Sequence, residues 1–559
     1  MSRVSRILIE KDVPIPLRDG TRTVGDLYRP ADGGPVPALV TRNPYDKEVE
    51  LRAVGTLPSP AKLVERGYAV VSTDTRGRFG SEGTFTPFQD EGPDGYDTIE
   101  WTAAQPWCDG NVGIYGPSYL GVTTMLAARE RPPSLRCAIP LITPDDYYRD
   151  WVYQGGAFKL GFALGWALGV AMAGARRAGG EAAERLAAAA ASLDLRRHHR
   201  PLASAPGLSQ PGVAPWWSEW LEHDRHNEYW RSFSPARDYA DYEVPMLHIS
   251  GWWDLFAQGT FRNFRALSVQ GRAPQHLWVG PWSHTHYDRY FAELDSGPTG
   301  SAANAGVVAA FNRFIDQHLR GGEPRLPRVR YFLLGANRWR DADDWPPPES
   351  EPRALYLHSN GRANSDRGDG LLGEEPPASA EHADRYLYDP ERPVPTTDPA
   401  GPRDQRSIEA RDDVLCYTTP PLEQPLVVAG PVTLDLWAST DAADTDWTGK
   451  LVDVHPDGRA VLLCDGIIRA RYRDSLADPR LLQPGRPTRY SIELGDIACR
   501  FGAGHRVRLE VSSSNFPRFD PNPNTGRTVA TETESRVAIQ EVLHDREHPS
   551  ALQLHVLPA

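Results

Sequence analysis

The segment NVGIYGPSYLG, residues 111–121, places a serine between a short apolar run and a helix-like segment. Apolar residues give the first part β-strand character, and the following VTTMLAARE has apolar residues at helical spacing. Ser118 lies on the turn between them. A serine nucleophile is commonly held on such a turn in a Gly-x-Ser-x-Gly motif. Here Leu120 occupies the last glycine position and Gly121 follows it, so the turn alone is equally compatible with a serine that caps a helix.

Strand and helix signals alternate on both sides of this turn. From about residue 145 the signals become helical only, and alternation resumes at VPMLHISGWWD. This pattern predicts an α/β fold with a largely parallel sheet and a helical insertion. We expect an α/β domain formed by residues 1–144 and 241–350, with a helical cap at 145–240.

The composition changes again after the proline-rich segment DDWPPPESEPR. Short β-like runs follow, separated by Pro, Gly and Asp turns, which is typical of an all-β sandwich or jelly roll. We place this domain at residues 351–559. We expect it to pack on the α/β domain and to help shape the site.

Charge and cysteine content limit the classes of partner. A formal charge of −13 disfavours nucleic acid and anionic membranes as partners. Five scattered cysteines without a CxxC pair indicate free thiols in a reducing compartment. The N-terminal segment lacks the features of a secretory leader, and the apolar run at residues 160–175 is shorter than the ~20 residues of a membrane span. We therefore expect a cytoplasmic chain, and the sequence leaves homodimer formation open.

Two further residues follow apolar strands in the way that a serine nucleophile requires. A serine hydroxyl needs a histidine base, which a carboxylate orients, and such groups gather at the carboxyl ends of strands. VPMLHISGWWD ends in Asp254, and HLWVGPWSH ends in His284. The order Ser118, Asp254, His284 is that of α/β-hydrolases. The sequence predicts this fold, with Ser118 as nucleophile, His284 as base and Asp254 as its orienting carboxylate.

An oxyanion also needs hydrogen-bond donors. The backbone N–H of Tyr119 follows the serine directly and is one candidate. VTRNPYDK ends an early strand, so that the Tyr45 hydroxyl is a second candidate. An ordinary turn tyrosine after Pro44 would give the same pattern.

The chain contains several longer, distinctive segments: RNPYDK, DTRGRFGSEG, WCDGNVGIYGPSYLG, GWWD, GPWSH, DDVLCYTTPPL, KLVDVHPDGRAVLLCDGIIRARYR and VSSSNFPRFDPNPNTG. Together they resemble the CocE/NonD family of serine hydrolases, which is related to the Xaa-Pro dipeptidyl-peptidases, over nearly the whole chain. The resemblance implies an α/β-hydrolase domain, a helical cap and a jelly roll. It also implies the triad given above, with an oxyanion hole made by Tyr45 and Tyr119. The expected partner is a small-molecule ester, and neither a cofactor nor a metal is implied.

In this family, aromatic residues line an acyl pocket. The matching positions are Trp151, Trp166 and Phe261, so the resemblance implies a pocket for an apolar or aromatic acyl group. Ordinary core aromatics would give the same pattern. The loop before DQRSIEARDD lacks the Leu-Phe pair that closes the pocket in the cocaine-hydrolysing member, so cocaine itself is not an expected substrate.

We interpret the chain as a serine carboxylesterase that forms an acyl-enzyme with small to medium apolar or aromatic esters. The same residues would suit an amidase, an acylase or an Xaa-Pro dipeptidyl-peptidase-like hydrolase. DLFAQGT, which starts at Asp254, lacks the further carboxylates that hold a substrate ammonium in α-amino acid ester hydrolases. A non-catalytic binding protein is the remaining alternative. His284, His286 and Asp288 in HTHYD have a spacing unlike that of a zinc site.

Overall fold

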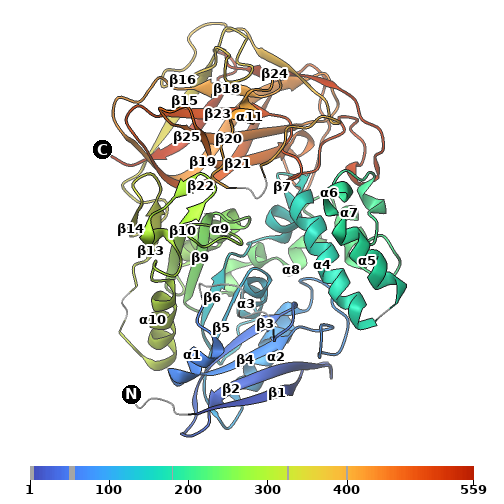
Figure 1. Ribbon diagram of the computed structural model, residues 1–559, viewed down its shortest axis with the longest axis vertical. Coiled ribbons are helices and arrows are strands. Elements are labelled where there is room, and N and C mark those ends of the chain that lie inside the picture. Colours follow the sequence, from blue (N-terminus) through green and yellow to red (C-terminus); the bar gives the residue numbers. More distant parts are fainter. Residues whose placement is uncertain (1–5, 49–56, 179, 324–325, 398–400, 559) are drawn as a thin grey trace.

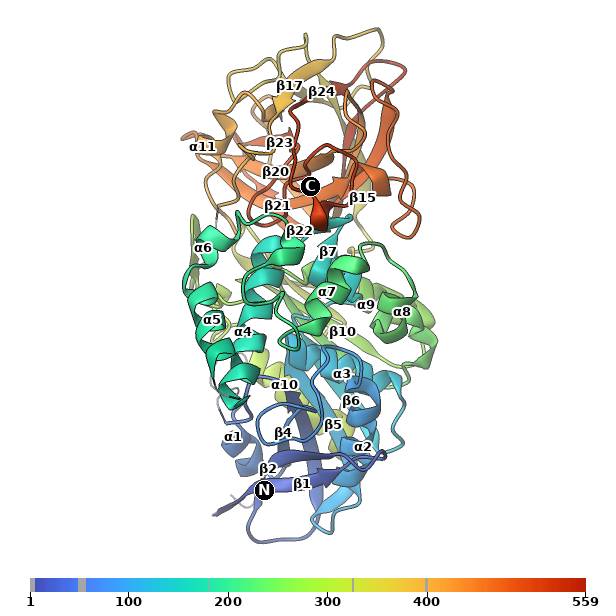
Figure 2. The same cartoon turned by 90° about the vertical axis from the view of Figure 1, so that its right-hand side faces the viewer.

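The computed structural model describes residues 6–48, 57–178, 180–323, 326–397 and 401–558. Two large β-sheets lie one above the other along the long axis of the molecule (Figure 1). The first sheet is at the N-terminal end, and the second belongs to a C-terminal β domain. A group of helices lies at mid-height between them (Figure 2).

The first sheet has ten strands among the described residues, and its centre is parallel. Antiparallel pairs occur only toward its two edges. The inner strands are almost fully buried, as expected for a parallel sheet that is covered by helices on both faces. In spatial order the strands are β1 (Ile7–Pro16), β2 (Arg22–Pro30), β4 (Ala69–Asp74), β3 (Val36–Asn43), β5 (Cys108–Pro117), β6 (Leu135–Leu141), β9 (Met246–Trp253), β10 (Gln275–Ser283), β13 (Val329–Leu333) and β14 (Arg338–Ala342).

Five of the described helices cover this sheet. The apolar clusters place α1 (Pro60–Glu65) and α10 (Val307–Arg320) on one face. The other face is covered by α2 (Glu91–Ala103), α3 (Tyr119–Arg129) and α9 (Ala257–Gln270). This is the predicted α/β-hydrolase arrangement, in which the carboxyl ends of the parallel strands meet at one edge.

The segment between β6 and β9 is helical, as its sequence predicts. It has a buried core rich in tryptophan, which includes Trp151, Trp217, Trp220 and Trp230. Its elements are η2 (Tyr147–Val152, a π-helix), β7 (Tyr153–Gln154), β8 (Ala157–Phe158), α4 (Leu160–Ala178), α5 (Glu181–Ala191), α6 (Leu193–Arg196), η3 (Leu202–Ser204), α7 (Pro215–Glu222), α8 (Glu228–Phe233), η4 (Pro235–Arg237) and η5 (Tyr239–Asp241). We call this segment the cap.

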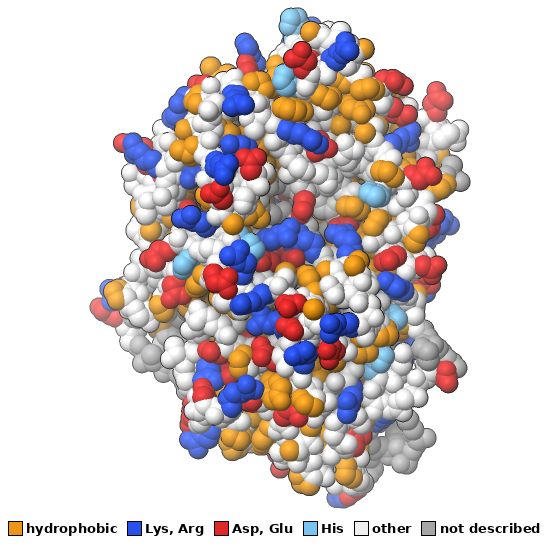
Figure 3. Space-filling view, turned by 180° about the vertical axis from the view of Figure 1, so that it is seen from behind, with side chains coloured by type: hydrophobic (Ala, Val, Ile, Leu, Met, Phe, Trp, Pro, Cys, Tyr) orange, Lys and Arg blue, Asp and Glu red, His pale blue; other side chains and the backbone are white. Residues whose placement is uncertain are grey.

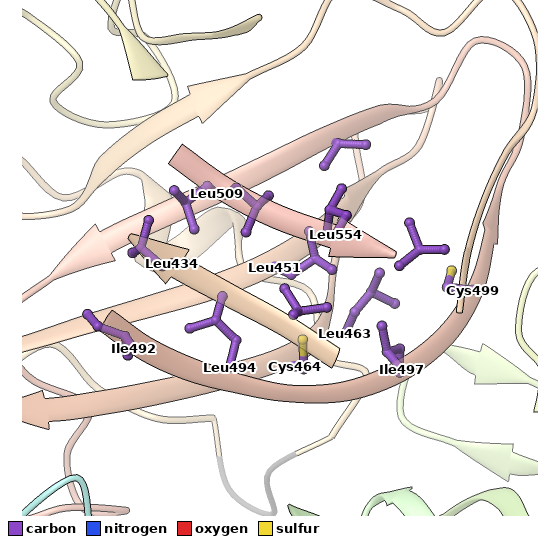
Figure 4. Packing of buried hydrophobic residues seen from close by; sticks show 14 of the residues in the cluster. Leu434, Leu451, Leu463, Cys464, Ile492, Leu494, Ile497, Cys499, Leu509 and Leu554 are labelled. Carbon is purple, nitrogen blue, oxygen red and sulfur yellow. The ribbon is translucent and has the colours of Figure 1, made fainter. Parts of the chain in front are cut away.

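The second sheet begins with β15 and is antiparallel apart from the β16–β18 pair. It forms the C-terminal β domain, and its inward-facing side chains converge in a close-packed core (Figure 4). Its strands are β15 (Glu351–His358), β16 (Leu371–Gly373), β17 (Asp384–Tyr388), β18 (Leu415–Thr418), β19 (Leu426–Thr440), β20 (Asp446–Val454), β21 (Ala460–Arg469), β22 (Thr488–Phe501), β23 (Arg506–Ser512), β24 (Ala538–Leu543) and β25 (Ala551–Val556). A short helix, α11 (Arg406–Glu409), precedes β18.

The core of the β domain continues into the first domain. Phe261 and Phe264 of α9 belong to the same apolar cluster as the residues of β19 and β22. Arg265 of α9 is paired with Asp496 of β22 at 2.7 Å, and Asp496 also accepts a hydrogen bond from Trp345 Nε1. The two sheets are therefore joined by a buried interface of apolar and ionic contacts.

Three features of the described residues relate to the expectations drawn from composition. None of the described helices has both the length and the apolarity of a membrane span. On the face seen in Figure 3, basic and acidic side chains are interspersed. All five cysteines are buried as free thiols.

Candidate active site

Ser118 lies on a sharp turn between β5 and α3. Its backbone has φ 57° and ψ −121°, a strained conformation for a non-glycine residue. The turn brings Gly116 against Leu120, where an added Cβ would stand 2.3 Å from the Leu120 Cβ. An added Cβ on Gly121 would stand 2.6 Å from Thr143 Cβ, beyond the end of β6. The close approach of α3 to the next strand thus falls at residue 121, which explains why Leu120 is tolerated.

Ser118, His284 and Asp254 form one hydrogen-bonded chain. His284 Nε2 lies 2.9 Å from Ser118 Oγ, and His284 Nδ1 lies 2.7 Å from Asp254 Oδ2. Asp254 is 6% exposed, and its Oδ1 accepts a hydrogen bond from the backbone N–H of Phe256 at 2.8 Å. The carboxylate can therefore hold the Nδ1–H tautomer, which leaves Nε2 free to take a proton from the serine.

The two tyrosines predicted from the sequence lie beside this chain. Tyr119 is the first residue of α3, where the helix supplies no acceptor for its N–H. The Tyr45 hydroxyl interacts with the Ser118 side chain, and burial raises its pKa above the usual range. The same hydroxyl accepts a hydrogen bond from Trp166 Nε1 at 2.8 Å. Because that contact occupies an acceptor site, the Tyr45 O–H proton is free to point toward an oxyanion.

Trp151 and Trp166 lie together, and their rings meet edge to face at 5.1 Å. Phe256 stacks on Trp151 at 4.7 Å and meets the His284 ring at 5.3 Å. Phe261, the third residue predicted to line the pocket, does not contact these rings. It is fully buried among Trp252 and Trp345 in the cluster shared with the β domain, because it lies on the face of α9 turned toward that domain.

Sequence reasoning missed Phe256 and Phe162, which pack with Trp151 beside His284, whereas Phe261 does not. Phe162 meets both Trp151 and Phe256 edge to face, at 5.2 and 5.4 Å. The available signal was the position of Phe256 two residues after Asp254.

A cavity of about 350 Å³ opens beside His284. The first domain, the cap and the β domain all contribute to its wall. The lining residues are Lys159, Gly161, Phe162, Arg197, Trp253, Leu255, Ser283, His284, Thr285, Thr396, Pro517 and Arg518.

Comparison with known proteins identifies the family. A model of the X-Pro dipeptidyl-peptidase (S15 family) matches residues 19–286, and one of the X-Pro dipeptidyl-peptidase C-terminal non-catalytic domain matches residues 322–553. Cocaine esterase from Rhodococcus sp. (strain MB1 Bresler) is 39% identical over 571 residues, which cover 98% of each chain. The chain belongs to the CocE/NonD family of serine hydrolases.

Two solved structures resemble this CocE/NonD hydrolase over its whole length. An aminopeptidase from a marine sediment archaeon, Thaumarchaeota archaeon, is 26% identical with a TM-score of 0.86, and covers 100% of this chain and 98% of its own. An α-amino acid ester hydrolase is 27% identical with a TM-score of 0.81, and the match covers 98% and 96% of the two chains. With the cocaine esterase match, these likenesses identify a serine ester hydrolase built from an α/β-hydrolase fold and a C-terminal β domain.

Lys159 of the cap contacts both the cap and the segment that follows Asp254. Its ammonium donates hydrogen bonds to the carbonyl oxygens of Asp150 and Leu255, the latter at 2.9 Å. Lys159 is 2% exposed, and burial lowers its pKa well below the usual range. Leu255 directly follows Asp254, so this lysine ties the cap to the segment that carries the carboxylate.

Among the described residues, one group has the composition of a metal site. Asp453, His455 and His505 of the β domain have ligand atoms within 4.8 Å of one another. His505 Nδ1 is also hydrogen-bonded to Asp453 Oδ1 at 2.8 Å. His286, from the HTHYD segment, instead contacts the carbonyl oxygen of Tyr290.

Proposed function

We propose that the chain is a serine carboxylesterase that cleaves small to medium esters with apolar or aromatic acyl groups. The observation that carries this proposal is the hydrogen-bonded chain of Ser118, His284 and Asp254 beside the Tyr45 hydroxyl. No step of the proposed reaction requires a cofactor.

The geometry supports the following order of events. Ser118 Oγ attacks the ester carbonyl while His284 Nε2 removes its proton. The Tyr45 hydroxyl and the Tyr119 N–H donate hydrogen bonds to the oxyanion that develops. His284 then passes the proton to the leaving alkoxide, and Asp254 stabilises the imidazolium in between. Water, deprotonated by His284, hydrolyses the acyl-enzyme by the same path in reverse.

The aromatic side chains near the serine favour an apolar acyl group. Phe162 and Trp166 are partly buried and pack on the fully buried Trp151. Phe256, which stacks on Trp151, meets the ring of His284. Transfer of apolar surface from water to such a site contributes roughly 25 cal/mol per Å². An acyl chain of a few carbons, or an aromatic acyl group, would gain most from this contact.

The second candidate function is cleavage of an amide or a peptide, because the similar structures include an aminopeptidase. A substrate with a free amine needs a carboxylate to hold its ammonium. Of the described residues that line the cavity beside His284, none is Asp or Glu. This composition favours the esterase over an enzyme that acts on free amines.

Matched p-nitrophenyl butyrate and p-nitrobutyranilide test the proposal, with Ser118→Ala as the control. We expect turnover of the ester that disappears in the variant, and little cleavage of the anilide. Similar efficiency on both substrates would favour the amidase. If the wild-type protein cleaves neither substrate, and a small fluorophosphonate does not label Ser118, the proposal is wrong.

A further inference from the structure

Two histidines of the β domain lie beside one buried carboxylate. His505 Nδ1 lies 2.8 Å from Asp453 Oδ1, and His455 Nε2 lies 3.5 Å from Asp453 Oδ2. The two imidazole rings are neighbours, with centroids 4.4 Å apart. Nitrogen and oxygen ligands that are bound to one zinc ion at about 2.0–2.2 Å stand about 2.9–3.5 Å from one another. Small side-chain rotations are therefore enough to bring the three groups around a single ion.

The carboxylate of Asp453 carries a buried charge that needs a positive partner. It is 6% exposed, and among the described residues its ion-pair partners are the two histidines, with no lysine or arginine. Arg459, in the same turn as His455, is instead paired with Asp457 at 2.8 Å. Neutral histidines satisfy the hydrogen bonds of a carboxylate but not its charge. Because buried charges are normally paired or bound to a metal, this position favours a cation.

The strands of the β domain hold the two histidines opposite each other. His455 directly follows β20 and His505 directly precedes β23, and these strands pair antiparallel with Val454 opposite Arg506. Backbone hydrogen bonds within its turn fix His455. The ring of His505 lies over Gly502, where an added Cβ would stand 2.9 Å from the ring Cδ2. Both histidines are partly exposed, so that an ion can enter from solvent.

We propose that Asp453, His455 and His505 bind one transition-metal ion, with Zn²⁺ as the expected occupant and water in the remaining position. Two imidazole nitrogens and a carboxylate suit zinc, cobalt, nickel and copper, whereas calcium and magnesium prefer oxygen ligands alone. His505 binds through Nδ1 and His455 through Nε2, the atoms that already face the carboxylate. The neutral His505 ring then carries its proton on Nε2 instead of Nδ1.

The ion acts on the stability of the β domain and not on the ester bond. Among the described residues that line the cavity beside His284, none belongs to this group of three. The group joins the turn after β20 to the turn before β23, and Asp453 and His505 are 52 positions apart in the sequence. An ion that binds only the folded chain stabilises it by mass action. With zinc at about 100 times Kd, we expect Tm to rise by about 2–6 °C.

Calorimetric titration with ZnCl₂ tests the site on the full-length protein, freed of metal with EDTA and then dialysed. The wild-type protein should bind one equivalent of zinc more than His455→Gln or His505→Gln. His548→Gln is the matched control, because His548 also pairs with a carboxylate, that of Asp545 at 3.1 Å, but belongs to no group of three ligands among the described residues. Unchanged stoichiometry in His455→Gln, or an equal loss in His548→Gln, would overturn the proposal.

Two measurements on the wild-type protein do not depend on how the variants fold. Co²⁺ should give visible absorption bands typical of a site with few ligands, and Zn²⁺ should displace them. If these bands are absent, the site is refuted, and Asp453 is neutralised by a protonated His505 as an ordinary ion pair. Thermal unfolding with and without one equivalent of zinc measures the shift in Tm. A Tm that zinc does not raise would refute the stabilising role, and neither result depends on the esterase proposal.

Discussion

Trp166→Phe tests whether the Trp166 side chain orients the oxyanion donor. The substitution removes the Nε1–H that donates to the Tyr45 hydroxyl at 2.8 Å and keeps an aromatic ring at that position. Without this donor, the Tyr45 hydroxyl can rotate, and its proton is no longer held toward the carbonyl oxygen at Ser118. A hydrogen bond between neutral groups contributes about 0.5–1.5 kcal/mol, which corresponds to about two- to tenfold in rate. We therefore expect kcat to fall by that factor.

Trp151→Phe is the matched control, because it removes the same volume from the same aromatic cluster. The Trp151 Nε1 has no hydrogen-bond partner among the described residues, so only packing changes there. Steady-state kinetics on p-nitrophenyl butyrate should show a lower kcat for Trp166→Phe, and mainly a higher KM for Trp151→Phe. An equal loss of kcat in both variants would refute the reasoning.

A double-mutant cycle checks the route through Tyr45. Tyr45→Phe removes the donor itself and should reduce kcat by about 100-fold or more. In that background Trp166→Phe should have little further effect, since the group that it orients is already absent. A full additional loss would show that Trp166 acts through packing alone.

Three further predictions concern stability. Gly259→Ala should destabilise the protein by about 1–3 kcal/mol in urea titrations, because the new Cβ would stand 2.3 Å from Asp150 Oδ2 and 2.6 Å from the Asp145 nitrogen. At Gly169, on the exposed side of α4, an added Cβ would meet no neighbouring side chain or loop within 4 Å. Gly169→Ala should therefore stabilise the protein by up to about 1 kcal/mol. Burial lowers the pKa of His248 to about 4, so the unfolded chain binds the extra proton first and stability falls as pH drops below about 6.5. Between pH 7 and pH 5 this histidine should cost about 2 kcal/mol of unfolding free energy, and His248→Gln should lack that part of the loss.

Each of these predictions has a result that contradicts it. Gly259→Ala with wild-type stability would mean that α9 can move away from the start of the cap. A destabilised Gly169→Ala protein would indicate a contact at that point of α4. If His248→Gln loses as much stability as the wild-type protein on acidification, other groups control the pH dependence.

The sequence predicted the fold and the three hydrogen-bonded residues because their signals are local. Ser118, Asp254 and His284 each follow an apolar strand directly, and parallel strands bring their carboxyl ends to the same edge of a sheet. The position of the close contact at the Ser118 turn was harder to predict from the sequence. The sequence shows that residue 120 is not glycine, but only the packing of α3 against Thr143 shows that Gly121 takes over that role.

Which aromatic residues lie beside His284 depends on contacts between segments that are distant in sequence. The sequence alone could not predict these contacts. Phe256 and Phe261 lie five positions apart, both are fully buried, and both are compatible with a pocket or a core. The β domain packs against α9, so that Phe261 lies beside Trp345 in the core shared by the two domains. Phe256, just before the helix, instead meets the ring of His284. Sequence periodicity gives the face of a helix, but it does not give what that face contacts.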